Sequence, residues 1–373
     1  MATDPIEKIA VWTLTAQGLA LARRIQQHRA VEVFASQRLT DESTAGDLSP
    51  FERLADALAQ QFNRYTGHIF IMATGIVVRC IVPLLRHKTF DPAVAVMDDR
   101  GRFVVSLVSG HLGGANRLTR QVAELLEATP VITTATDVNE KPAIDILAQE
   151  QGLAIENPEA IKTVNMAILD GTPIGVYDPG DWLHRRLPEA FSLSQDQLNE
   201  RLPPSVSACV WIDDTIGDIP SDFLVLRPPS LVAGIGCNRH TPAQEIGEFL
   251  LNVMEDFGLA LKSLTAIASI DLKSDEIGLC EIAEKMNLPL QFFSKDELAR
   301  VESVPTPSSL VAKHIGVPSV CEAAAILASR NGQLIVPKHN TRNVTVAIAR
   351  MACTSSASAP ATQPIYPNAP EKS

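Results

Sequence analysis

The sequence contains few aromatic residues and no closely paired cysteines. Phe, Trp and Tyr together make up 5% of the 373 residues, so the cores must be built mostly from Ala, Val, Leu and Ile. No two of the six cysteines have the C-x-x-C spacing of a zinc ribbon, and their scatter is not that of a disulfide framework. We therefore expect separate, mostly buried thiols at Cys80, Cys209, Cys237, Cys280, Cys321 and Cys353.

The chain also lacks a basic excess, a long apolar run and a signal-peptide pattern. Its formal net charge is −11, which argues against a nucleic-acid partner because such binders usually carry a basic face. A local cluster of cations can still bind an anionic small molecule. No segment approaches the roughly 18 apolar residues that span a bilayer. The sequence thus predicts a soluble, cytoplasmic protein without a membrane partner.

The N-terminal part alternates short apolar segments with amphipathic ones. Strands are expected at 8–14, 31–36, 68–73, 93–98, 103–108 and 130–134, and helices at 16–27, 51–65, 76–85 and 114–127. Pro50 is expected to open its helix and Gly75 to end its strand. Asp99-Arg100-Gly101 is a hairpin signal between two of the strands. This rhythm is typical of a mainly parallel sheet with helices on its faces.

The regular alternation of expected strands and helices weakens after residue 138 and returns at residue 230. The middle region predicts helices near 142–151 and 158–170 and short strands at 173–177, 206–212 and 223–226. The C-terminal region predicts strands at 231–236, 263–269 and 288–293, a final hairpin of 333–337 and 344–349, and helices at 241–258, 274–286, 308–315 and 320–329. We predict an α/β protein with two α/β domains, 1–138 and 230–353, a smaller α+β middle module, 139–229, and a disordered Ser/Ala/Pro-rich tail, 354–373.

One glycine-rich turn, Ser109–Asn116, leads from an expected strand into an expected helix. We call it the first glycine turn. Gly110, Gly113 and Gly114 allow positive φ and close approach of a ligand, and the following helix N-terminus suits an anion. His111 lies inside the turn, where an imidazole can act as an acid or a base near neutral pH. A hydrogen-bonded histidine in a tight turn is the equally weighted alternative.

A second glycine-rich turn, Gly234–His240, begins like a dinucleotide fingerprint but has Arg239 at its sixth position. We call it the second glycine turn. Thr241 is expected to cap the next helix, with Pro242 at its first position. Arg239 is a candidate anion partner beside Gly236. Cys237 becomes a nucleophile only if its pKa is lowered, and packing behind the turn is the favoured role.

Other candidates lie near strand ends. Arg79 follows Gly75 by about one helical turn and is expected to reach over the same sheet edge. Glu322 follows Ser319 by three residues, so a capping box competes with a binding role. Lys338, His339 and Arg342 form a basic hairpin loop for which a solvated role is favoured over a functional one.

Six sequence blocks carry a resemblance to a known family. The N-terminal blocks are IMATGIVVRCIVPLL (71–85), LVSGHLGGANRLTRQVA (107–123) and PVITTATDV (130–138). The C-terminal blocks are VAGIGCNRHT (232–241), VPSVCEAAA (317–325) and NVTVAIAR (343–350). Together these blocks resemble cobalt-precorrin-5A hydrolases, the CbiG family, over about residues 8–350, and the C-terminal blocks also resemble CobE. Asn238 departs from the arginine that many members carry there, which weakens the expected anion site.

The resemblance implies a substrate and a reaction in anaerobic cobalamin biosynthesis. Water opens the δ-lactone of cobalt-precorrin-5A, and acetaldehyde release then gives cobalt-precorrin-5B. The cobalt arrives inside the substrate, so neither a cofactor nor a metal site of the protein is expected.

Several residues are then assigned expected roles. His111 is the hypothesised base and Asp137 the alternative. The N–H groups of Gly113 and Gly114 are the expected oxyanion donors. The other residues expected to bind the substrate are Gly75, Arg79, Gly110, Asn116, Gly236, Cys237, Arg239 and Glu322.

Two other hypotheses about the function stay open at this point. The likeness to CobE allows a non-catalytic carrier of corrinoid intermediates, above all for residues 231–350. A nucleotide-dependent enzyme is disfavoured because the second glycine turn lacks a third glycine and no acidic residue follows at a strand end about twenty residues on. Expected partners are the neighbouring enzymes of the pathway, and a homodimer is the assembly to test.

Overall fold

The structure is a computed structural model that describes residues 8–39, 48–86, 90–195, 197, 205–301, 305 and 319–351. The chain divides into two compact units. The first comprises residues 1–177, 183–211 and 219–226, and the second comprises residues 178–182, 212–218 and 227–373. The predicted helix at 308–315, Cys353 and the predicted tail lie outside the described residues.

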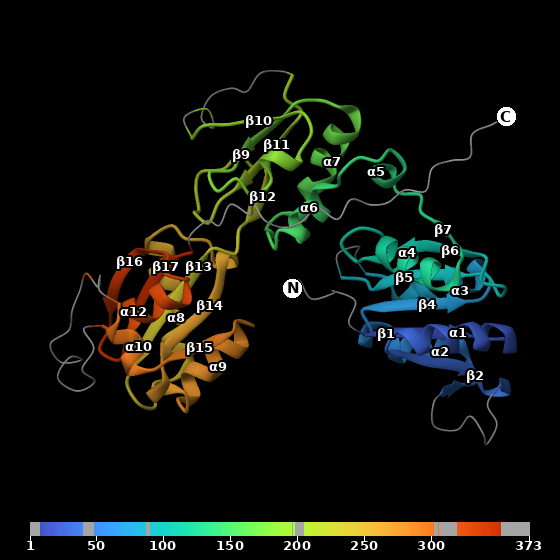
Figure 1. Cartoon of the computed structure of the whole chain (residues 1–373), viewed down its shortest axis with the longest axis horizontal. Helices are drawn as coiled ribbons and strands as arrows, with labels where there is room; N and C mark the ends of the chain where they lie inside the picture. The colour runs from blue at the N-terminus through green and yellow to red at the C-terminus, as the bar shows by residue number, and fades with distance from the viewer. Residues whose placement is uncertain are drawn as a thin grey trace. The chain divides into compact units, whose positions relative to one another are not determined.

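The first unit contains a seven-stranded sheet with the order β3-β2-β1-β4-β5-β6-β7 (Figure 1). Its strands are β1 (Ile9–Thr13), β2 (Val31–Ser36), β3 (Ser49–Phe51), β4 (Gly67–Ile71), β5 (Ala93–Met97), β6 (Phe103–Val108) and β7 (Thr129–Val131). Strands β1 to β5 are parallel, β6 is antiparallel to β5, and β7 is parallel to β6. The carboxyl ends of β6 and β7 therefore lie at the edge where β1 to β5 begin.

Helices cover both faces of this sheet, which explains why its inner strands are apolar throughout. The helices are α1 (Ala16–His28), α2 (Leu54–Gln61), α3 (Thr74–Ile81) and α4 (Ala115–Leu126). Ile9 and Val11 pack with α1 and α4, whereas Ala10 and Trp12 pack with α2 and α3. The predicted α/β class is confirmed, and so is the hairpin of β5 and β6.

His68 lies at the centre of an aromatic cluster on β4 and is fully buried. Trp12 donates a hydrogen bond from Nε1 to Nδ1 of His68 (3.0 Å), and Nε2 of His68 lies 3.0 Å from the Phe62 carbonyl oxygen. The Phe62 ring stacks on the imidazole with 4.9 Å between centroids. Burial lowers the pKa of His68 to about 4, so the ring is neutral near pH 7.

Two predicted boundaries in this sheet are wrong. Pro50 does not open a helix: it lies within β3, and α2 begins at Leu54. Proline is tolerated there because β3 is the edge strand and needs no further ladder partner. Gly75 does not end a strand, since it lies in the first turn of α3, which begins at Thr74.

A smaller sheet follows with the order β10-β9-β11-β12-β8. Its strands are β8 (Ala154–Ile155), β9 (Ile174–Tyr177), β10 (Ala190–Ser192), β11 (Ala208–Ile212) and β12 (Leu224–Arg227), and the helices of this region are α5 (Ala135–Val138), α6 (Ile144–Glu150) and α7 (Ile161–Asp170). The sequence did not predict β8 or β10, because segments of two or three residues carry no readable alternation.

The second unit contains a five-stranded sheet with the order β15-β14-β13-β17-β16. Its strands are β13 (Leu231–Cys237), β14 (Leu264–Ile270), β15 (Leu290–Phe293), β16 (Gln333–Asn340) and β17 (Val344–Arg350). Strands β13, β14 and β15 are parallel, and the predicted hairpin of β16 and β17 adds two antiparallel strands beside β13. A smaller share of the strand pairs is therefore parallel in this sheet than in the first.

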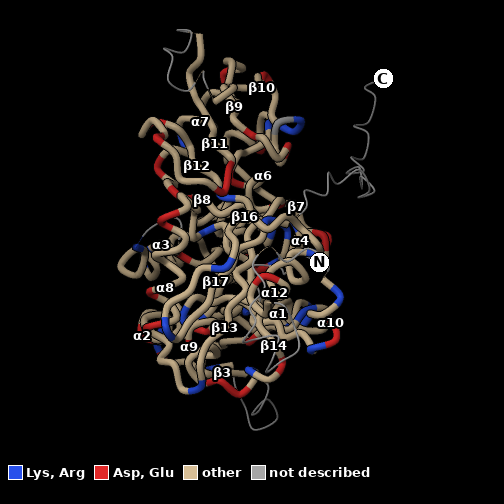
Figure 2. Tube along the Cα trace, turned by 90° about the vertical axis from the view of Figure 1, so that its left-hand side faces the viewer, with Lys and Arg blue, Asp and Glu red and all other residues tan. Residues whose placement is uncertain are grey.

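Helices again cover both faces of the second sheet. They are α8 (Ala243–Asp256), α9 (Ile277–Lys285), α10 (Lys295–Ala299) and α12 (Val320–Ala328). Ala233 and Ile235 pack with α8 and α9, and Val232 packs with α10 and α12. Charged residues of both signs are interspersed along the trace in the view of Figure 2.

Three helix starts in this unit show how its caps form. Ser294 forms a capping box at the start of α10, with Glu297 as its partner. Thr241 does not cap α8: its hydroxyl donates to the Asn238 carbonyl oxygen (2.9 Å), and Pro242 takes the cap position. Ser319 has no side-chain cap bond, so the Glu322 capping box does not form.

Candidate functional site

The first glycine turn is a compact loop between β6 and α4. Ser109 (φ 61°) and Gly114 (φ 85°) adopt left-handed conformations, and the Ser109 hydroxyl donates to the Asp91 carbonyl oxygen (2.9 Å). A Cβ atom on Gly113 would lie 2.3 Å from that of Ser109, so only glycine fits there. The turn is held to the start of β5 and has little room for a different sequence.

The turn uses most of its own backbone donors. The N–H of Gly114 donates to the His111 carbonyl oxygen (2.8 Å), that of Ala115 to Ser109 (2.9 Å) and that of Asn116 to Gly110 (3.0 Å). Gly114 is therefore unavailable as the predicted oxyanion donor, and the first amides of α4 do not cradle an anion as predicted. The N–H of Gly113 makes no backbone hydrogen bond within the described residues, so its predicted donor role stays a prediction.

The His111 imidazole lies between two carboxylates. Its Nε2 is 3.4 Å from Oδ2 of Asp137 and 3.0 Å from Oγ1 of Thr136. Its Nδ1 is 3.4 Å from Oδ2 of Asp145. The hydrogen bond to Asp145 raises the pKa of His111 above its usual value, against a lowering by burial, and the Asp137 charge adds to the rise. The two carboxylates thus stabilise the protonated imidazole more than water does around an isolated histidine.

Asp137 is held as a carboxylate by its neighbours. Burial acts to raise its pKa, but hydrogen bonds from Thr134 and Arg120 and the Arg120 charge hold that pKa below its usual range. The Asn116 amide also donates to Asp137 Oδ2 (2.9 Å). Asn116 is buried, so it orients Asp137 and is not placed to meet a substrate carboxylate as predicted.

Asp145 is the residue of this site that the sequence did not reveal. It lies in the first turn of α6 with its side chain 4% exposed, and Asn165 of α7 donates to its Oδ1 (3.1 Å). Burial acts to raise the pKa of Asp145, but the hydrogen bonds from His111 and Asn165 lower it overall. The only sequence signal was a carboxylate seven residues after the PVITTATDV block, near the start of the helix expected at 142–151.

A cavity of about 340 Å³ opens beside His111. The first glycine turn supplies Gly110 and His111 to its wall, and Asp145 lines it from α6. Lys162 and Met166 of α7 also line it. The cavity therefore combines a titratable pair, a cation and apolar surface.

Gly75 and Arg79 are not brought to this cavity. Strand pairing aligns Ile71, at the end of β4, with Met97 of β5 and Val104 of β6, whereas the first glycine turn follows Val108. Gly75 thus lies at the opposite edge of the sheet, and the exposed Arg79 does not line the cavity. We expected Arg79 and the first glycine turn to lie at the same edge of the sheet. This expectation was wrong because β6 is antiparallel to β4.

The second glycine turn is arranged differently from its prediction. Arg239 donates to Asp275 and to the Leu272 carbonyl oxygen (3.0 Å), so its guanidinium is bound to the protein itself. Burial raises the pKa of the Cys237 thiol despite a lowering by Lys273, which argues against a thiolate nucleophile. Gly236 and Cys237 line a separate cavity.

Glu322 is fully buried and accepts a hydrogen bond from the Lys338 N–H (3.0 Å). Its carboxylate therefore supports β16 and is not exposed to a ligand. Among the described residues no cluster of three His, Cys, Asp or Glu side chains is arranged to hold a metal ion. No described helix is long and apolar enough to cross a membrane.

The fold and the carboxylate-bound histidine define an α/β protein with a titratable side chain beside a cavity at a glycine-rich strand end. Comparison with known proteins gives the family. Residues 56–137, 142–228 and 231–349 match the families described as cobalamin synthesis G N-terminal, cobalamin biosynthesis central region and cobalamin synthesis G C-terminus. The chain belongs to the cobalt-precorrin-5A hydrolase (CbiG) family, as the sequence blocks predicted.

Three relatives illustrate the similarity. The cobalt-precorrin-5A hydrolase of Salmonella typhimurium is 38% identical over 93% of this chain and 99% of its own length. That of Priestia megaterium is 34% identical over 91% of this chain and 94% of its own. Protein CobE of Sinorhizobium sp is 33% identical over 32% of this chain and 79% of its own length.

Proposed function

We propose that this chain hydrolyses cobalt-precorrin-5A, opening its δ-lactone with water and releasing acetaldehyde to leave cobalt-precorrin-5B. Two relatives that share 34–38% identity over most of this chain are hydrolases of that name. The observation that carries the proposal is His111, held between Asp137 and Asp145 on the wall of a cavity. The cobalt belongs to the substrate in this scheme.

Ring opening is the first step and uses the protonated His111. Water adds to the lactone carbonyl carbon, and the bond from that carbon to the ring oxygen breaks, so the oxygen stays on the meso carbon as an alkoxide. His111 donates its proton to the leaving alkoxide, and the protons of the water pass to solvent as the carboxylate forms. The N–H of Gly113 is the proposed donor to the tetrahedral oxyanion.

Carbon–carbon cleavage is the second step and uses the neutral His111 that the first step leaves. The imidazole takes the proton of the new carbinol, the bond from the meso carbon to the macrocycle breaks, and acetaldehyde departs. The bonding electron pair stays on the macrocycle, and His111 is protonated again. One residue thus serves as acid and then base, while the two carboxylates keep its orientation.

Asp137 is the weaker base of the two candidates. Its pKa is held low, so it accepts a proton poorly, and its contacts with Arg120 and Asn116 fix its position. We assign it the stabilisation of the His111 imidazolium. Lys162, which also lines the cavity, is the proposed partner of a substrate carboxylate.

Anaerobic incubation with cobalt-precorrin-5A, with acetaldehyde as the readout, tests the function. The wild type should release acetaldehyde repeatedly, and His111→Ala should lose about 100-fold or more in rate, the usual scale of acid–base catalysis. His28→Ala, on the last turn of α1, is the matched control and should retain the wild-type rate.

The same assay separates hydrolysis from a carrier role, which the similarity of part of the chain to CobE supports. A carrier binds the intermediate stoichiometrically and yields no acetaldehyde. Folded wild-type protein that binds the substrate without product would refute the hydrolase proposal. A wild-type rate in His111→Ala would remove His111 from the chemistry.

A further inference from the structure

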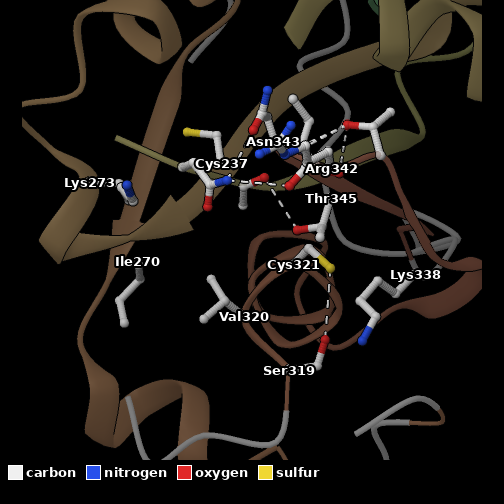
Figure 3. Close-up of a pocket in the computed structure, with 14 residues that line it drawn as sticks. Cys237, Ile270, Lys273, Ser319, Val320, Cys321, Lys338, Arg342, Asn343 and Thr345 are labelled. Carbon is white, nitrogen blue, oxygen red and sulfur yellow. Dashed lines mark hydrogen bonds between the residues drawn. The ribbon is translucent and has the colours of Figure 1, made fainter. Parts of the chain in front are cut away.

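The second unit has a cavity of about 240 Å³ at the carboxyl end of β13 (Figure 3). Cys237 of β13, Val320 of α12 and Thr345 of β17 line it. This lies where the strand order reverses. From β13 the chain proceeds outward through β14 and β15, then returns to place β16 and β17 on the other side of β13. Ligands of open α/β sheets typically bind in the crevice at such a point.

Three cations line this cavity, and each comes from a different part of the fold. Lys338 lies on β16, Arg342 in the turn before β17, and Lys273 directly after β14. Among the described residues that line it there is no Asp or Glu. The chain has a net charge of −11, so these three cations form a locally positive group in a negatively charged protein. A group of this kind favours binding of an anion.

Two buried carboxylates lie behind the cations without lining the cavity. Glu322 accepts from the Lys338 N–H, and Glu276 Oε2 is 3.4 Å from Lys273 Nζ. These contacts hold the backbone of Lys338 and the ammonium group of Lys273 in position. The first turn of α12 adds to the wall and has no side-chain cap, so its amide dipoles also favour negative charge.

Close packing keeps the start of α12 against β13. A Cβ atom on Gly234 would lie 1.9 Å from the Cys321 carbonyl oxygen. The cavity is smaller than the roughly 300–1,000 Å³ of a pocket for a drug-sized ligand. It therefore suits one or two arms of a larger molecule.

We infer that this cavity binds a carboxylate-bearing arm of the tetrapyrrole substrate through Lys338 and Arg342. This inference rests on the proposed function and replaces Arg239 as the cationic group of this domain. The cations hold an arm that takes no part in bond breaking. They therefore bind the ground and transition states alike, and their loss should raise KM with little change in kcat.

Steady-state acetaldehyde release from cobalt-precorrin-5A is the test. Lys338→Gln and Arg342→Gln should each raise KM about fivefold or more and the double variant about 20-fold or more, with kcat within about twofold. Lys285→Gln, at the far end of α9, is the matched control and should keep the wild-type KM. An unchanged KM in the double variant overturns the inference while the proposed function stands.

A binding titration covers the case in which the wild type releases no acetaldehyde. The probe is uroporphyrin, a tetrapyrrole with a carboxylate on every arm, followed by its fluorescence. The double variant should bind it about tenfold or more weakly than the wild type and with a smaller salt dependence. Equal affinity of the two proteins would overturn the inference, and absent turnover would refute the proposed function separately.

Discussion

Asp145 controls the protonation of His111 more than any other residue, since its hydrogen bond is the largest cause of the raised His111 pKa. The proposed first step needs the imidazolium, so activity should persist to higher pH than an unperturbed histidine allows and fall above the raised pKa. Asp145→Asn removes the charge but keeps an oxygen near Nδ1. The basic limb of its kcat/KM profile should therefore move to lower pH.

The measurement is acetaldehyde release across pH 5.5–9. Above the limb, the rate should fall roughly tenfold per pH unit as the protonated fraction falls. Glu150→Gln, at the end of the same helix, keeps the His111 contacts and should leave the profile in place. A uniform drop in rate without a shifted limb would show that Asp145 only orients the ring.

His68 should make the first unit sensitive to acid. Its folded pKa of about 4 lies below the usual 6.5, so the unfolded state binds the proton first as pH falls. The stabilisation is complete above pH 6.5 and is lost between pH 6.5 and about 4, by about 3 kcal/mol in total. Urea unfolding at several pH values measures this loss.

His68→Gln keeps one donor and one acceptor in place of the ring. Its free energy of unfolding should be lower than that of the wild type at pH 7.5, because the stacking with Phe62 is lost. Between pH 6.5 and 4.5 it should fall less steeply than the wild type. An identical pH slope in both proteins would place the acid sensitivity elsewhere.

At the scale of elements, the backbone of α12 packs so closely against Gly234 of β13 that no side chain fits between them. Gly234→Ala would set its Cβ 1.9 Å from the Cys321 carbonyl oxygen and 2.8 Å from the Ala325 nitrogen, both backbone atoms. The helix must move, so we expect a loss of about 3 kcal/mol in the free energy of unfolding. Chemical denaturation followed by circular dichroism measures it.

Gly236→Ala, two residues along the same strand, is the graded control. Its Cβ would meet only the Thr345 hydroxyl, at 2.6 Å, and that side chain can rotate. We expect a loss of less than about 1.5 kcal/mol. Equal losses in both variants would show that the position of α12 does not depend on the Gly234 contact.

Elements with strong periodicity were predictable, and the direction of strands was not. The helices α1 and α4 and the hairpin of β5 and β6 followed from apolar spacing and one turn signal. The edge strand β3 was missed because Pro50 is a helix-start signal in sequence and an edge-strand residue in space. The Thr241 cap failed because its hydroxyl found a nearer acceptor in the turn.

At the scale of the whole molecule, the second unit includes residues 212–218, which are distant in sequence from the rest of it. Asp214 in this segment accepts two hydrogen bonds from Arg350, at the end of β17, at 2.7 and 2.8 Å. Ser230 also donates to the buried carboxylate of Asp214 (2.6 Å). This ion pair fastens the segment to the sheet.

Arg350→Ala should cost about 3–5 kcal/mol, because it leaves the buried Asp214 carboxylate without its main cation. Arg350→Lys keeps the charge without the two-point geometry and should cost less. Hydrogen exchange followed by mass spectrometry should show faster exchange in β13 and β17, with β1 and β4 unchanged. Faster exchange in both units alike would contradict a role confined to the second.

Site residues that directly follow predicted strands could be predicted from the sequence. Those that depend on how distant segments pack together could not. His111 and Asp137 were both candidates, and they lie together because each follows a strand end and β6 and β7 are parallel neighbours. Asp145 was missed because its role depends on where α6 packs. Gly75 and Arg79 were misplaced because nothing in the sequence states that β6 reverses the direction of the sheet.

The reversal of β6 and β7 also separates two parts of the molecule that can change independently. The loops after β1, β4 and β5 lie at one edge of the first sheet, and the His111 turn lies at the other. Natural insertions or engineered grafts at the first edge should therefore leave the acid–base site intact. The N-terminal domain thus offers a site for attaching new sequence without rebuilding its chemistry.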